Sequence, residues 1–198
     1  MKNKKGTSLM AVGAMLLLAA LALTAYNLYD EKRAEKNALN ALSQIDTASS
    51  EQSNTEIPDY VLNPDMSMPT VTVNGEEYVG VLKIPEINLV LPVLDECDTK
   101  NLKKAPCRYQ GTAYLGNMII AGHNYKTHMK HIDTLEAGDK IFFTDTDKNI
   151  FEYEVVGTEI IDGTDVERMV RSDSWNLTLF TCTYDGRKRI TIRAASVN

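Results

Sequence analysis

The fold is decided by a stretch near the C-terminus, residues 177–194, which reads LTLFTCTYDGRKRITIRA. Its second half, RITIRA, alternates in polarity as a β-strand with one buried face does, and its first half, LTLFTC, is a β-type run that ends in a cysteine. Between them, Tyr184-Asp185-Gly186-Arg187 supplies the residues of a turn. The stretch therefore predicts a hairpin of two strands, Leu177–Cys182 and Arg189–Ala194, with a cysteine at the end of the first strand.

Strand geometry predicts which side chains of this hairpin meet. The two isoleucines of the second strand should face the core, which turns Arg189 and Arg193 outward. By the same alternation Cys182 faces outward, where a substrate groove must lie. We therefore expect Arg189 beside Cys182. Arg193 should lie roughly 13 Å further along the strand, and Arg187 in the turn.

Short strands separated by turns continue upstream to residue 70. Val71–Val73 and Tyr78–Leu82 flank Asn74-Gly75, a pair that favours a type I′ hairpin turn. The other expected strands are Lys83–Pro85, Asn88–Val93, Met118–Ala121, Lys140–Phe143, Phe151–Gly157 and Thr158–Ile161. Residues 70–198 are enough to enclose one core, and this strand spacing is typical of a closed barrel or a sandwich.

The N-terminus has a different character. Three lysines within residues 2–5 precede an apolar run, Leu9–Tyr26, whose only polar member is Thr24. As a helix this run is roughly 27 Å long, close to the hydrocarbon thickness of a bilayer. We expect a single-pass anchor with the lysine-rich end in the cytoplasm and the rest outside. The alternative is a signal peptide cleaved after Ala20-Leu21-Ala22.

These observations divide the chain into three parts. Residues 1–29 form the cytoplasmic tip and transmembrane anchor. Residues 30–69 form a stalk and linker: Asp30–Ile45 is expected to continue as a helix, and the proline-rich segment Ile57–Pro69 is expected to lack regular structure and to drape over the next domain. Residues 70–198 form the β domain.

Cys182 and His123 each follow the end of an expected strand, and both residue types carry chemistry. A cysteine nucleophile needs a group that exchanges its proton and a donor that stabilises an oxyanion. His123 and Arg189 are the candidates for these roles. Taken alone, a cysteine at a strand end is more commonly a small core residue. The spacing of His123, His128 and His131, five and three residues, matches no zinc pattern, so no metal site is predicted.

Several motifs, in this order along the chain, resemble those of the sortase family. They comprise the opening strands, a histidine motif, the turn before the next strand and a T-L-x-T-C…R signature. The matching segments are LKIP (82–85) with LPV (91–93), IAGHN (120–124), LEAGD (135–139), and TLFTC (178–182) followed by RITIRA (189–194). The resemblance covers roughly residues 70–198, plus the N-terminal anchor.

The resemblance implies an all-β fold, a closed eight-stranded sortase-type barrel behind a transmembrane helix and stalk. It implies a cysteine transpeptidase of the Gram-positive cell surface. Such an enzyme cleaves an LPxTG-like C-terminal sorting motif of exported proteins through a thioester, and passes the acyl group to an amine of the peptidoglycan precursor or a pilin. Cys182 would be the nucleophile, His123 the general acid/base, and Arg189 the group that steadies substrate and oxyanion. Thr181 would help the oxyanion.

The subclass is expected to be class B or B-like, from Gly122-His123-Asn124 and the short hairpin between Cys182 and Arg189. The segment Asp162–Ser174, however, is shorter than class B usually has. The D-P-aromatic lid of pilin-polymerising sortases is missing from the sequence, and Asn63–Met66 is the candidate to cover the groove instead. No cofactor is expected. Calcium activates part of the family, so acidic residues in loops are candidate calcium ligands, although such residues are usually only solvated. The candidates here are Asp95, Glu96, Asp98, Asp162, Asp165 and Glu167.

Composition limits the remaining choices. The chain carries 27 Asp and Glu against 21 Lys and Arg, a net charge of -6, which argues against a nucleic-acid partner. Cys97 and Cys107 flank a polar loop and form either a disulfide or two free thiols. Two functions compete with the transpeptidase: a surface cysteine peptidase that releases its acyl group to water, and an anchored adhesion module in which Cys182 is buried and inert.

Overall fold

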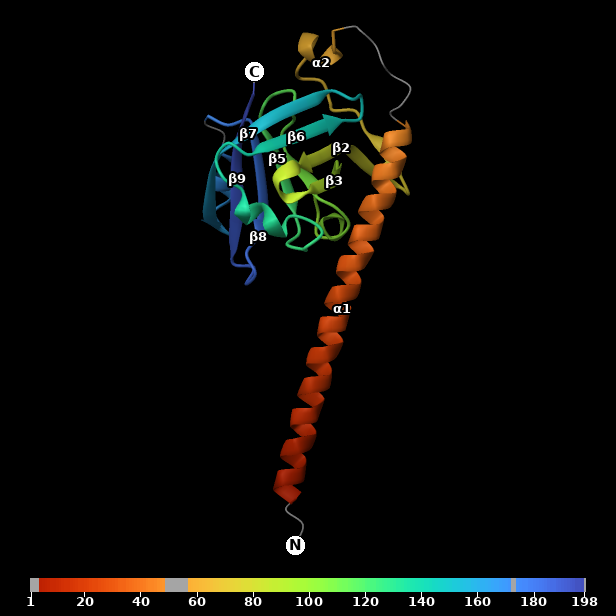
Figure 1. Cartoon of the computed structure of the whole chain (residues 1–198), viewed down its shortest axis with the longest axis vertical. Coiled ribbons are helices and arrows are strands. Elements are labelled where there is room, and N and C mark those ends of the chain that lie inside the picture. The colour runs from red at the N-terminus through yellow and green to blue at the C-terminus, as the bar shows by residue number, and fades with distance from the viewer. Residues whose placement is uncertain (1–3, 49–56, 172–173, 198) are drawn as a thin grey trace.

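The computed structural model describes residues 4–48, 57–171 and 174–197. A long helix, α1 (Lys4–Ala48), runs past one side of a β-barrel, and its N-terminal half extends away from the rest of the molecule (Figure 1). The polar linker expected between the stalk and the β domain falls mainly on residues 49–56, outside the described residues.

Nine strands of the described chain form one sheet in the order β1-β2-β3-β4-β5-β8-β9-β7-β6, and β2 also pairs with β6. The strands are β1 (Val71–Val73), β2 (Glu76–Ile84), β3 (Leu89–Leu94), β4 (Cys107–Gln110), β5 (Met118–Gly122), β6 (Lys140–Asp145), β7 (Ile150–Asp162), β8 (Leu177–Cys182) and β9 (Lys188–Ser196). The β2–β6 pairing closes strands β2 to β9 into the eight-stranded barrel that was predicted. β1 is a short additional strand on β2.

Both predicted hairpins are present. Asn74 and Gly75 have φ angles of 53° and 80°, the positive values that a type I′ turn requires between β1 and β2. β8 and β9 pair antiparallel, with Cys182 opposite Arg189. Short helices occupy the connections: α2 (Asp59–Leu62), η2 (Pro85–Ile87), η3 (Asn101–Lys103), η4 (Lys130–Thr134) and α3 (Val166–Val170).

Three parts of the strand prediction differ from the structure. Lys83–Pro85 is not a separate strand, because Lys83 and Ile84 end β2 and Pro85 begins η2. The residues expected to form two strands, Phe151–Gly157 and Thr158–Ile161, form the single strand β7 instead. Its register against β9 shifts between Val155 and Gly157, so an irregularity in the ladder, rather than a turn, interrupts the alternation. The strand β4 was not expected at all. It has only four residues, Cys107–Gln110, which are too few to show a clear pattern in the sequence, and only Cys107 among them is buried.

The barrel is buried on both faces of its central strands. Inside it, Leu82, Ile120 and Ile192 belong to one apolar core. A second apolar cluster covers the outer face, where Phe180 of β8 packs with Met169 of α3 and with other buried residues. A side chain that points outward from the barrel is therefore not necessarily exposed to solvent.

This second core overturns the expected exposure of Arg193. Its side chain is only 3% exposed. The guanidinium donates to the Glu159 carboxylate at 2.8 Å, to the Thr178 hydroxyl at 2.8 Å, and to the backbone carbonyls of Met169 and Arg168 at 3.0 and 2.6 Å. Arg193 does point outward from the barrel, but α3 and its flanking residues lie over it. It holds α3 against the sheet.

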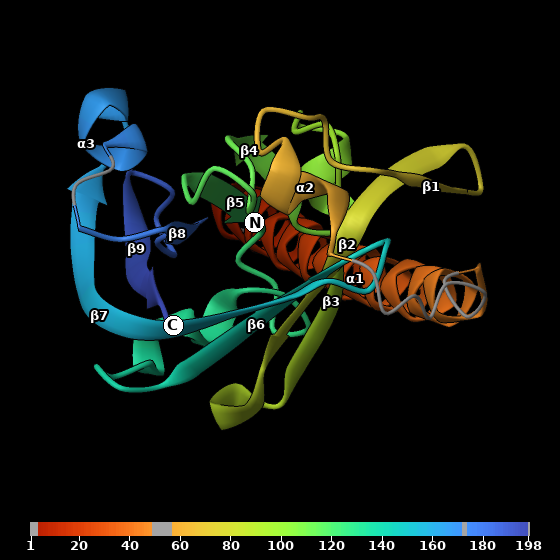
Figure 2. The ribbon, with the colours of Figure 1, turned by 90° about the horizontal axis from the view of Figure 1, so that it is seen from above.

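The outer part of α1 packs on the barrel. One stripe of its surface is buried, at spacings of four, three and four residues, which is the spacing of one helix face; it consists of Ala34, Ala38, Ala41 and Ile45. The small alanines let the helix come close to β1 and β3, which it contacts. Seen from above, α1 passes beneath β2 and β3 (Figure 2). The predicted stalk is thus a helix that is also part of the domain's packing.

The proline-rich segment 57–69 does drape over the barrel, but it is not entirely irregular. One helical turn, α2, lies between Pro58 and Pro64. The residues of this turn include no proline, so their backbone N–H groups remain available for helical hydrogen bonds. Tyr60 of α2 stacks on Tyr114 with ring centroids 4.6 Å apart and also contacts Phe151.

Candidate active site

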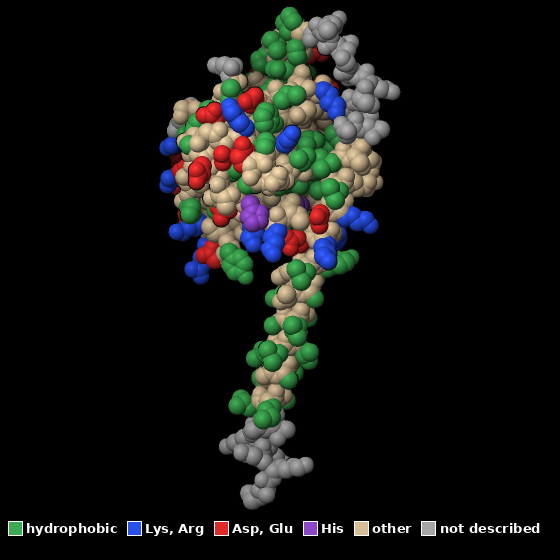
Figure 3. Space-filling view, viewed as in Figure 1, with side chains coloured by type: hydrophobic (Ala, Val, Ile, Leu, Met, Phe, Trp, Pro, Cys, Tyr) green, Lys and Arg blue, Asp and Glu red, His purple; other side chains and the backbone are tan. Residues whose placement is uncertain are grey.

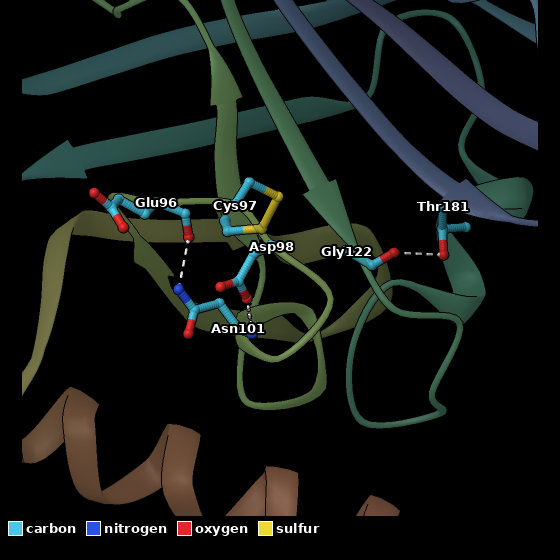
Figure 4. Close-up of a disulfide and its surroundings, with 7 residues drawn as sticks. Glu96, Cys97, Asp98, Asn101, Gly122 and Thr181 are labelled. Carbon is cyan, nitrogen blue, oxygen red and sulfur yellow. Dashed lines mark hydrogen bonds between the residues drawn. A yellow bond between two sulfur atoms is a disulfide. The ribbon is translucent and has the colours of Figure 1, made fainter.

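Strand pairing brings two of the predicted catalytic residues to one end of the barrel. β5 and β8 are parallel neighbours, with Gly122 aligned with Thr181. The Thr181 hydroxyl donates to the Gly122 carbonyl at 2.9 Å (Figure 4). His123 follows Gly122, and Cys182 follows Thr181 as the last residue of β8, so both lie at the same end of the sheet. We call this end of the barrel the site end.

Arg189 joins them from the third strand. It lies directly opposite Cys182 on β9, and opposed residues of an antiparallel pair share a face. Its Nη1 donates to the carbonyls of Gly186 and Lys188, both at 3.0 Å. Gly163, at the end of β7, leaves room for this side chain: a Cβ there would lie 3.0 Å from Nη1. The three predicted residues therefore lie at the same end of the barrel, and their roles stay a prediction. Arg187 is exposed in the turn.

Cys182 is the only free thiol of the chain's three cysteines. Cys97 and Cys107 form a disulfide, which resolves the alternative left open by the sequence (Figure 4). The bridge ties the β3–β4 connection to the first residue of β4, which pairs with Ala121 near the site end. The side chain of Cys182 is partly exposed. This exposure argues against the adhesion module, which required a buried and inert cysteine.

His123 lies in a half-buried position under an aromatic ring. Its imidazole stacks on Tyr125 with centroids 3.8 Å apart and planes 16° from parallel. Burial lowers the pKa of His123, Asp30 opposes the shift and Lys103 adds to it. The lowered pKa favours the neutral imidazole near neutral pH, the form that can accept a thiol proton.

The loop that carries His123 is fastened to α1. The Tyr125 hydroxyl donates to Asp30 at 2.7 Å, and the backbone N–H of Lys126 donates to Glu31 at 2.7 Å. Burial and the hydrogen bond to Asp30 raise the pKa of Tyr125, so its hydroxyl stays protonated as a donor. Sequence reasoning missed these contacts because each joins residues 95 positions apart, and Asp30 gave no signal beyond helix propensity.

The same loop folds back tightly on β5. Met129 is fully buried, and its N–H donates to the His123 carbonyl at 3.3 Å. A Cβ on Gly122 would lie 2.0 Å from the Met129 sulfur, so glycine permits this approach. His128 is also fully buried, and burial, with a smaller effect of His123, lowers its pKa to about 4. Within the described residues neither ring nitrogen of His128 has a hydrogen-bond partner.

Several of the candidate calcium ligands are engaged with the protein itself. Asp95 pairs with Arg108, and Asp98 accepts the N–H of Asn101. Asp162 accepts from Thr164, and Asp165 caps α3. Across residues 4–48, 57–171 and 174–197 no group of three or more His, Cys, Asp or Glu is arranged to hold a metal ion.

The expected cover over the groove is in the wrong place. Asn63–Met66 follows α2, whose Tyr60 packs on residues near the starts of β5 and β7. The Thr146 hydroxyl binds the Pro69 carbonyl at that same end, beyond β6. The segment therefore lies at the end of the barrel opposite Cys182. The prolines of this segment predicted that it would run over the surface of the barrel, but they did not indicate which end it would cover.

Comparison with known proteins agrees with this geometry. Sortase A of Bacillus anthracis is 27% identical over 191 residues, which are 91% of this chain and 90% of that protein. The solved structure of Listeria monocytogenes sortase A is 26% identical and covers 61% of this chain and 88% of its own, with a TM-score of 0.54.

A Clostridium perfringens sortase D5 transpeptidase shares the fold at 20% identity, with a TM-score of 0.60 over 84% of this chain and 99% of its own. These relatives are named sortase A and sortase D, so the class B assignment stays a prediction. The sortase domain family matches residues 82–197, which include all three predicted catalytic residues. The chain belongs to the sortase family.

Proposed function

We propose that this protein is a membrane-anchored transpeptidase that cleaves an LPxTG-like sorting motif of exported proteins and joins the acyl part to a cell-wall or pilin amine. One observation carries the proposal. The chain's single free thiol, Cys182, ends β8 where the neighbouring strand delivers His123 and the opposed strand presents Arg189.

The chemistry follows from the roles of these three groups. The neutral His123 imidazole accepts the Cys182 proton as the sulfur attacks the Thr–Gly carbonyl carbon of the motif. The Arg189 guanidinium stabilises the oxyanion. His123 then gives its proton to the leaving glycine amine, and a thioester remains on Cys182. An acceptor amine attacks the thioester, passes a proton back through His123 and releases the thiol.

Thr181 has a supporting role in this proposal. Its hydroxyl is already donated to the Gly122 carbonyl, and this contact holds the two strands together one residue before both reacting groups. We therefore assign it to positioning, which helps the oxyanion indirectly.

The anchor and topology are also proposals. α1 contains a helix segment long and apolar enough to cross a membrane, Ser8–Ile45, and the exposed leucines of its first half have no protein cover. The lysines of residues 2–5 favour a cytoplasmic N-terminus, with the barrel outside.

Incubation of the full chain with a sorting peptide, with and without an amine acceptor, tests the function. We expect the ligated product to dominate when the amine is present, and Cys182→Ala to form none while keeping its fold. Peptide released to water at the same rate with and without amine would contradict transfer and support the peptidase instead.

A further inference from the structure

The site end of the barrel lies at the level of the lipid headgroups when α1 crosses a bilayer. The apolar run ends at Tyr26, and Asp30 is four residues later, about 6 Å along the helix. The headgroup layer on each side of a bilayer is about 5–8 Å deep. α1 is unbroken over these positions. Because Asp30 and Glu31 bind Tyr125 and Lys126, the loop that follows β5 lies in or beside this layer.

Basic side chains gather at this end of an otherwise acidic chain. Three connections meet there, residues 98–104, 123–131 and 183–189. They contain two aspartates and eight lysines and arginines: Lys100, Lys103, Lys104, Lys126, Lys130, Arg187, Lys188 and Arg189. Of these eight, Lys104 alone forms an ion pair with a described residue, Glu76. Figure 3 shows lysines and arginines along the lower rim of the barrel, beside the place where α1 leaves it.

Four further acids border the rim: Asp133, Asp162, and Asp30 and Glu31 of α1, which accept from the Tyr125 hydroxyl and the Lys126 N–H. Asp162 lies near Lys188 and Arg189, and its carboxylate accepts from Thr164. The rim therefore keeps an excess of positive charge, which favours an anionic partner.

An aromatic side chain stands at the tip of the same rim. Tyr184, in the turn between β8 and β9, is 101% exposed. The turn is closed by hydrogen bonds between Thr183 and Lys188, which leave Tyr184 outside it. In Figure 1 this turn points along α1 towards its N-terminal half. A tyrosine beside basic residues is the combination found where proteins meet the membrane–water interface.

We propose that the site end docks on the surface of the anionic bilayer that α1 enters, with Tyr184 in the interface and the lysines among the headgroups. This inference rests on the membrane anchor proposed above. α1 brings the rim to the bilayer, and the rim charges and Tyr184 then fix the barrel's rotation and tilt. Cys182 thus faces the membrane surface, so a substrate held in the same membrane reaches the thiol without diffusing away.

Tryptophan quenching by brominated lipid tests the docking. The full chain with Tyr184→Trp is reconstituted into bromolipid vesicles of phosphatidylcholine alone or mixed with phosphatidylglycerol. The wild-type chain, whose only tryptophan is Trp175, gives the baseline. We expect the emission of the tryptophan added at position 184 to be lost in the phosphatidylglycerol vesicles. Neutralising Lys126, Lys130 and Arg187 to glutamine should restore it.

A matched control places the new tryptophan at the far end of the barrel. Leu62 of α2 is 76% exposed, and Leu62→Trp should stay unquenched in both vesicles. Equal emission of the two variants in phosphatidylglycerol vesicles, or quenching at position 184 that does not depend on phosphatidylglycerol, would overturn the docking. Vesicle flotation separates the two proposals. A chain that fails to float with the vesicles overturns the anchor and the docking together, whereas one that floats unquenched overturns the docking alone.

Discussion

Three arginines follow Cys182 on the β8–β9 hairpin, and their surroundings give them different tasks. Arg189 lies opposite Cys182 on the neighbouring strand, Arg187 is exposed in the turn, and Arg193 is buried under α3. Arg189→Ala should lose most of the acyl-transfer rate, mainly in kcat/KM, and Arg189→Lys should not restore it because an ammonium lacks the planar fork. Arg187→Ala should transfer at nearly the normal rate. Near-normal transfer by the Arg189 variant would contradict its assignment.

The buried arginine should show itself in stability instead. Arg193→Ala leaves the buried Thr178 hydroxyl without its partner and leaves Glu159 with only its more exposed pair, Arg168. Removing one member of such a buried pair costs about 3 kcal/mol of unfolding free energy. Urea unfolding of Arg193→Ala against Arg187→Ala measures the difference. Equal midpoints for the two variants would mean that the network does not hold α3.

His128 should make the fold sensitive to acid. Its pKa is about 4 in the folded protein against an ordinary value of 6.5, so the unfolded chain binds the proton first as the pH falls. The stabilisation is complete above pH 6.5 and is lost towards pH 4. Between neutral pH and about pH 5 the unfolding free energy should fall by about 2 kcal/mol.

Variants separate this effect from general acid sensitivity. His128→Leu should remove most of the slope in urea unfolding, leaving a smaller part from His123, whose pKa is lowered in the same direction. His131→Gln, on an exposed position of η4, should keep the full slope. An unchanged slope in His128→Leu would show that the buried imidazole is not responsible.

At the scale of elements, α1 has two functions. One face packs on the barrel through small residues, and Asp30 fixes the loop on which His123 lies. Tyr125→Phe keeps the ring that stacks on the imidazole but removes the hydrogen bond to Asp30. A hydrogen bond to a charged group contributes about 1.5–3 kcal/mol, so loss of loop order should lower kcat/KM by roughly tenfold.

Asp30→Asn should lower the rate in the same way, and the double variant should be no slower than either single one, because both changes remove one contact. Asp133→Asn, an exposed acid on η4, is the matched control. Additive losses in the double variant would show that Asp30 and Tyr125 act separately.

The placement of Cys182 opposite Arg189 could be predicted from sequence because strand alternation and a short turn are local features. Cys182 and Arg189 are joined by a short turn, and His123 ends a strand of continuous apolar residues. The position of α1 could not be predicted in this way. Its contact with Tyr125 spans 95 residues, and an alanine-rich helix surface does not reveal which neighbour it will meet.

At the scale of the whole molecule, the barrel's closure and its second core explain the remaining differences. The alternation of side chains along β9 predicted that Arg193 points away from the barrel interior. Whether it is buried depends on what covers the outer face of the sheet. α3 supplies that cover, and its position is set by tertiary contacts such as the hydrogen bond from Arg193 to the Met169 carbonyl. The Cys97–Cys107 bridge likewise needed the fold, because spacing alone fitted free thiols equally well.

The topology of the molecule concentrates the chemistry at one end. The parallel pair β5–β8, the β8–β9 turn and the turn of α1 that carries Asp30 all meet there, and the one free thiol lies among them. The central claim is therefore that Cys182 alone carries the acyl group.

Peptide mapping by mass spectrometry, after the full chain is quenched in acid during turnover of a sorting peptide, tests this claim most directly. We predict that the thioester is found on the peptide that contains Cys182, that it disappears when an amine is added, and that Cys97→Ala and Cys107→Ala still form it. A thioester on Cys97 or Cys107, or continued product formation by Cys182→Ala, would contradict the claim.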